Sequence, residues 1–131
     1  MKKPDLLERT QNFGVRIMNL VEHLPSTKSS NVIANQLMRS AFSIGANYRA
    51  VQRAKSSRDF INKLKIVEEE TDETLFWLEL IEKGKIFPSG RIRNVKLEAR
   101  ELLSIFVASI KTAKSNQAKN KYEGRSTKDE Q

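Results

Sequence analysis

Apolar residues recur every three or four positions in four separate stretches of this chain. That spacing places them on one side of a helix, because an α-helix completes a turn in about 3.6 residues. Only 3 prolines and 5 glycines occur in 131 residues, so the four stretches are almost uninterrupted. The pattern predicts four amphipathic helices, each of which buries one face.

Breaks between the stretches set the expected boundaries. Pro25 ends the first helix because proline lacks the amide donor that a helix needs. Ser56 has the spacing to Asp59 of a capping box, so a third helix starts directly after the second. Gly84 is a typical C-terminal stop. The expected helices span about residues 5–23, 31–54, 56–84 and 91–113.

Short connections between long helices favour an all-α, antiparallel, up-down-up-down four-helix bundle over residues 1–113. The apolar content falls sharply after Ala113, and residues 114–131 are mostly polar or charged. Such a segment cannot bury enough apolar surface to offset the entropy of ordering it. We therefore expect a bundle domain followed by a disordered polar tail.

Several classes of function find no support in the composition. The chain has no cysteine, which excludes disulfides and thiolate metal sites and favours a cytoplasmic location. The one histidine is His23, so no Glu-x-x-His pair exists for a di-iron site in a bundle. No apolar run approaches the roughly 20 residues of a membrane span. We expect no catalytic residue, no metal, no cofactor and no membrane contact.

Positive charge is concentrated in one part of the chain. The net charge is +8, and residues 39–65 contain seven basic side chains against one acidic. Arginine suits forked contacts to phosphate, so this segment predicts nucleic-acid binding, with the backbone of structured RNA as the expected ligand. No run of aromatic residues offers a stacking platform for single strands. The predicted contact residues are Arg39, Arg49, Arg53, Arg58 and Lys65.

An alternative use of the same residues is structural. A run of acidic side chains, residues 68–73, follows the basic segment directly. Arg49 and Arg53 would then pair with these carboxylates within one chain or across subunits. The protein would act as an interaction scaffold in which basic and acidic faces match each other.

The second and third helices each carry apolar residues outside their main stripe. Large apolar side chains on the outside of a bundle usually mark an interface, so these residues predict self-association. The alternative is that a wide bundle core absorbs them. The residues expected at the oligomer interface are Met38, Phe42, Gly45, Ile66, Phe76, Trp77 and Leu80.

Two segments carry a family resemblance: SIGANYRA at residues 43–50 and IVEEETDETLFWL at residues 66–78. Over about residues 5–113 the chain resembles the bacterial four-helix-bundle proteins encoded within intervening sequences of large-subunit ribosomal RNA genes. The resemblance implies a homo-oligomeric ring, most often a pentamer, without known enzymatic activity.

A related branch of that family is the accessory variability determinant of diversity-generating retroelements. It implies nucleic acid and a reverse transcriptase, or another acidic protein, as candidate partners. The chain departs from the family pattern after Asn47, where many relatives carry a glutamate two or three residues on and this sequence has Arg49 and Ala50.

Overall fold

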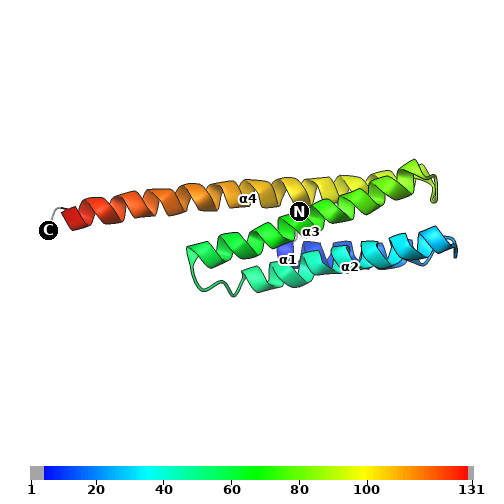
Figure 1. The fold of residues 1–131 in the computed structure, drawn as a ribbon, viewed down its shortest axis with the longest axis horizontal. Coiled ribbons are helices and arrows are strands. Elements are labelled where there is room, and N and C mark those ends of the chain that lie inside the picture. The colour runs from blue at the N-terminus through cyan, green and yellow to red at the C-terminus, as the bar shows by residue number, and fades with distance from the viewer. Residues whose placement is uncertain (1–4, 130–131) are drawn as a thin grey trace.

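The computed structural model describes residues 5–129, which form four α-helices (Figure 1). The helices are α1 (Leu6–Val21), α2 (Lys28–Val51), α3 (Ser57–Lys83) and α4 (Ser89–Asp129). Each helix packs antiparallel to the next in sequence, and α1 also contacts α4. The predicted all-α, up-down-up-down bundle is confirmed. No helix within the described range is long and apolar enough to cross a membrane.

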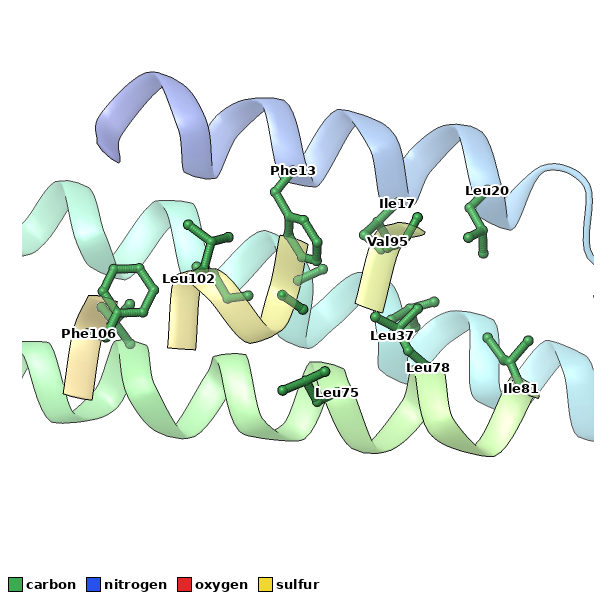
Figure 2. Close-up of a cluster of buried hydrophobic side chains, with 14 of the residues drawn as sticks. Phe13, Ile17, Leu20, Leu37, Leu75, Leu78, Ile81, Val95, Leu102 and Phe106 are labelled. Atoms are coloured by element: carbon green, nitrogen blue, oxygen red, sulfur yellow. The ribbon is translucent and has the colours of Figure 1, made fainter. Parts of the chain in front are cut away.

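The core lies along the bundle axis and receives side chains from all four helices. Figure 2 shows Phe13 and Ile17 of α1 pointing toward Leu37 of α2 and Leu78 of α3. The apolar residues that recur at the three/four spacing along α4 are buried from Ile92 to Ile110. These side chains are removed from water at roughly 25 cal/mol per Å² of apolar surface, so their burial is the main stabilising term.

The helix starts follow local capping chemistry. Ser56 caps α3 as predicted, because its hydroxyl accepts a hydrogen bond from the Asp59 amide at 3.0 Å. The second helix begins earlier than expected. Thr27 caps it by accepting from the Ser30 amide at 3.2 Å, so the chain is helical from Lys28 rather than from about residue 31.

The third helix ends at Lys83, next to the predicted stop at Gly84. Gly84 itself is not left-handed; the residue with positive φ is Lys85, at 54°. The amide of Ile86 donates to the carbonyl of Ile81, and the amide of Lys85 donates to that of Glu82, both at 3.1 Å. This is the Schellman pattern, with a lysine where glycine is usual.

The fourth helix continues through Asp129, well beyond the expected end at Ala113 (Figure 1). Its C-terminal part extends past the turn between α2 and α3. The side chains of residues 114–122 are mostly exposed, as their polar character predicts. The remainder of the expected disordered tail, the side chains of residues 123–129 and the whole of residues 130–131, lies outside the described structure.

Buried polar groups tie neighbouring helices together. The hydroxyls of Ser40 on α2 and Thr74 on α3 lie 2.9 Å apart, and both residues are fully buried. Lys96 of α4 binds Glu82 of α3 at 2.7 Å. This contact holds the pKa of the Glu82 carboxyl below its usual value. Such pairs fix the height of one helix relative to the next.

Candidate nucleic-acid interface

The turn between α2 and α3 brings the predicted basic segment into one region. Asp59 holds the turn from the start of α3: its carboxylate accepts from the Lys55 amide at 3.0 Å and from the Lys63 ammonium at 2.7 Å. The contact with Lys63 lowers the pKa of the Asp59 carboxyl. The one acidic residue of this segment is therefore committed to its own turn and to one lysine.

A hollow of about 530 Å³ lies beside this turn, on the outer side of α2. Ala46 and Ala50 form part of its lining, and small side chains leave room for a ligand next to the helix backbone. The charged residues around it are Arg49, Arg53, Lys55 and Lys63. A concave site with cations on several sides suits a phosphate group.

The guanidinium groups of Arg49 and Arg53 are exposed and form no ion pair or hydrogen bond with any side chain that the structure describes, residues 5–122. Arg58 and Lys65 are likewise exposed and unpaired in the described chain, on α3 beyond the hollow. Four of the five predicted contact residues are thus open to solvent. Lys55 and Lys63 were not among the predicted contact residues, although both belong to the basic segment at residues 39–65.

Arg39 has a different environment. Its guanidinium contacts the carboxylates of Glu70, at 3.5 Å, and of Glu73 on α3. The pairing with the acidic run that the scaffold interpretation expected for Arg49 and Arg53 is therefore made within the chain by Arg39. This arginine has less free charge to offer a polyanion than the arginines at the turn.

The outer face of α3 carries most of the residues expected at an oligomer interface. Ile66, Phe76 and Leu80 are 44%, 53% and 38% exposed. Trp77 is half-buried against the core; its ring packs edge-on against Phe76, with centroids 4.9 Å apart, and its indole donates to Glu73 at 3.3 Å. The apolar stripe therefore lies beside the carboxylates that hold Arg39.

The remaining expected interface residues lie at a second place, an open groove of about 620 Å³ between α1 and α2. Phe42 is exposed in this groove and Gly45 lies beside the backbone of Thr10, whereas Met38 packs partly against the core. The α1 wall of the groove was not predicted from the sequence. Its signal was present as a second apolar stripe, formed by Leu7, Val15 and Met18.

Two polar residues considered from the sequence have local roles. The side-chain amide of Asn47 donates to the Ser43 carbonyl one turn earlier, at 2.8 Å. The Nδ1 atom of His23 lies 2.8 Å from the Asn19 carbonyl, just after the end of α1. Among the side chains of residues 5–122, no three histidine, aspartate or glutamate groups converge as they would around a metal ion.

Comparison with known proteins places this geometry in a family. The family profile described as "23S rRNA-intervening sequence protein" matches residues 2–108. A crystal structure from Bacteroides thetaiotaomicron, described as a protein with unknown function from the S23 ribosomal protein family, is similar at 34% identity and a TM-score of 0.76. The similarity covers 82% of this chain and 99% of the other. The comparison with curated proteins gives no match.

Proposed function

The chain belongs to the 23S rRNA-intervening sequence protein family, and from its surface we propose that it is a non-enzymatic, homo-oligomeric bundle that binds RNA. The observation that carries this proposal is the hollow at the α2–α3 turn. Arg49 and Arg53 border it without a carboxylate partner among the described residues, and Lys55 and Lys63 complete its rim. Lys63 is paired with Asp59, so the charge free for a ligand comes mainly from the two arginines, and cations in a concave site raise the local concentration of phosphates.

Self-association follows from the two apolar surfaces. The α3 stripe and the α1–α2 groove are unlike each other and lie on different parts of the bundle. When one surface of a subunit binds a different surface of the next, the contact is heterologous and generates a ring if the rotation closes. The pentameric number rests on the family resemblance, and the cytoplasmic location rests on the cysteine-free composition.

A direct test is to titrate the protein with a hairpin RNA at about 50 and 200 mM salt. Each phosphate neutralised on a duplex contributes about −0.9 to the slope of log affinity against log salt. If Arg49 and Arg53 each neutralise one phosphate, their contribution is about −1.8, or roughly a tenfold loss over this fourfold change in salt. Affinity that does not depend on salt, or no binding at low salt, would overturn the proposal.

The double variant Arg49→Ala/Arg53→Ala makes the test specific. It should make the slope of log affinity against log salt less steep by about two, and it should leave the protein assembled. The control Arg16→Ala/Lys28→Ala removes the same charge from exposed positions away from the turn, and it should leave the slope nearly unchanged. An equal effect of the two double variants would mean that net charge, rather than the hollow, governs binding.

The second candidate function is the interaction scaffold. The contact of Arg39 with Glu70 and Glu73 supports it, because one arginine of the basic segment already pairs with the acidic run within the chain. In a scaffold, Arg49 and Arg53 would pair with acidic residues of a neighbouring subunit or of another protein, such as a reverse transcriptase. The same double variant then breaks the assembly, and sedimentation finds a 15.0 kDa species.

A further inference from the structure

A second hollow, of about 410 Å³, lies on the other side of the α2–α3 turn, against α4. It exists because α4 runs past the turn rather than ending beside it (Figure 1). Phe60 of α3 and Lys55 of the turn form one side of its lining. Three amide side chains of α4 form the other: Asn116, Gln117 and Asn120.

The amides are placed to bind a planar polar ligand. Asn116 and Asn120 are four residues apart, so they lie one above the other on the same face of α4. The side-chain amides of Asn116, Gln117 and Asn120 make no hydrogen bond with the described residues. Each amide therefore has both a donor and an acceptor available.

The opposite side of the hollow is aromatic. Phe60 is half-buried and packs on the hydrophobic core, so its ring is held in place while part of it remains accessible. An aromatic ring offers a surface on which a base can stack. Phe60 and Asn116 are far apart in the sequence, so no short sequence motif could have indicated that they line the same hollow.

Positive charge connects this hollow to the first one. Lys55 lines both, and Arg53 lies two residues before it on the rim of the first. On α4, residues 102–122 contain no acidic residue, and their four lysines are Lys111, Lys114, Lys119 and Lys121. A nucleic-acid backbone that lies over the turn and along α4 therefore meets cations of both elements and no carboxylate of residues 102–122.

We propose that the hollow between the turn and α4 binds one unpaired base of the RNA, extruded from a bulge or loop, while Arg49 and Arg53 hold the adjacent backbone. The base stacks on Phe60, and the α4 amides contact its edge. Recognition of RNA sequence commonly uses unpaired bases in this manner. The inference rests on the proposed RNA binding and adds to it a site whose α4 wall lies beyond the family match at residues 2–108.

The test compares two hairpin RNAs that differ only in one bulged adenosine. Adenine is the first choice because its N6 and N7 atoms pair with an asparagine or glutamine amide. We expect wild-type protein to bind the bulged hairpin about tenfold more tightly than the plain one. Asn116→Ala/Asn120→Ala should abolish this preference without weakening binding to the plain hairpin.

Two controls complete the design. Asn94→Ala changes an exposed asparagine on the distant part of α4 and should retain the preference. Alanine favours helix more than asparagine does, so loss of α4 does not account for an effect of the double variant. Phe60→Leu, with its folding checked by thermal melting, should reduce the preference in the same way, because leucine fills the space but offers no ring.

The outcomes separate this inference from the RNA binding on which it rests. Equal affinity of wild-type protein for both hairpins, or a preference that survives Asn116→Ala/Asn120→Ala, overturns the base site and leaves RNA binding intact. Failure to bind either hairpin overturns both proposals. Saturable binding of free AMP that is lost in Asn116→Ala/Asn120→Ala, without any gain from the bulge, makes the hollow a site for free nucleotides and overturns its assignment to a base of the RNA.

Discussion

Replacing Arg9 by alanine should loosen α1 from α4. The guanidinium of Arg9 donates two hydrogen bonds to the Glu98 carboxylate, at 2.7 and 3.1 Å, and lies 2.8 Å from a carboxylate oxygen of Glu101. The Arg9 and Glu98 side chains are only 15% and 21% exposed. These contacts raise the pKa of Arg9 above its usual value. They form a charged clamp between the first and last helices, whose backbones otherwise meet over a small area.

The expected cost follows from this partial burial. An exposed ion pair contributes about 0–1 kcal/mol, whereas removal of one partner from a buried pair costs about 3–5 kcal/mol. Arg9 and Glu98 lie between these limits, so Arg9→Ala should lower the free energy of unfolding by about 2–3 kcal/mol. For a domain of this size the melting temperature should fall by roughly 10 °C.

Denaturant titration of wild-type protein and Arg9→Ala measures this loss directly. Arg16→Ala is the matched control, because it removes an exposed arginine from the same helix and should change stability by less than about 0.5 kcal/mol. The double variant Arg9→Ala/Glu98→Ala should cost less than the sum of the two single changes, since neither charge is then left alone. A loss below about 0.5 kcal/mol for Arg9→Ala, or strict additivity, would refute the clamp.

Two further changes test local energetics. Lys85→Gly should raise the free energy of unfolding by about 1 kcal/mol in a denaturant titration, because only glycine adopts the φ of 54° at this position without a steric cost; an unchanged or lower value would contradict the assignment of strain to Lys85. Glu82→Gln should flatten the loss of stability in acid. The Lys96 contact lowers the pKa of folded Glu82 below 4.5, so its contribution is complete above about pH 4.5 and disappears as the pH falls through the lowered value; wild-type protein and variant that lose stability in parallel below pH 4.5 would contradict this.

The sequence predicted the core well because every helix had to bury its stripe to fold. Phe13, Leu37, Leu78 and Phe106 are all at most 1% exposed, at positions that the three/four spacing assigns to the inner face. The extent of α4 was harder to predict. Its apolar pattern stops at Ala113, but no proline or glycine lies between there and residue 122. Extending an existing helix costs far less free energy than nucleating a new one. The absence of a stop residue after Ala113 therefore affects the length of α4 more than the loss of the apolar spacing does.

The candidate site was predictable in composition and unpredictable in arrangement. The sequence showed that the segment is basic, but it did not show which arginine forms an ion pair with a carboxylate. Arg39 is paired, and Arg49 has no acidic partner among the described residues, because the two lie at different positions along the bundle axis. No residue near them in the sequence determines those positions. The second hollow could not be predicted either, because it also depends on how the helices are placed relative to one another. It joins Phe60 to Asn116, which meet only because α4 passes the turn.

The antiparallel hairpin of α2 and α3 explains why free charge gathers at the turn. Ser40 on α2 lies opposite Thr74 on α3. From this pair toward the turn, residue numbers rise along α2 and fall along α3. Arg39 therefore meets the acidic run of α3, whereas Arg49, further along, meets the basic start of α3 at Lys63. Asp59 offsets the charge of Lys63, but the unpaired like charges near the turn still oppose folding, and a bound polyanion removes that repulsion. Because such a ligand binds only the arrangement that the fold creates, RNA binding should also stabilise the bundle.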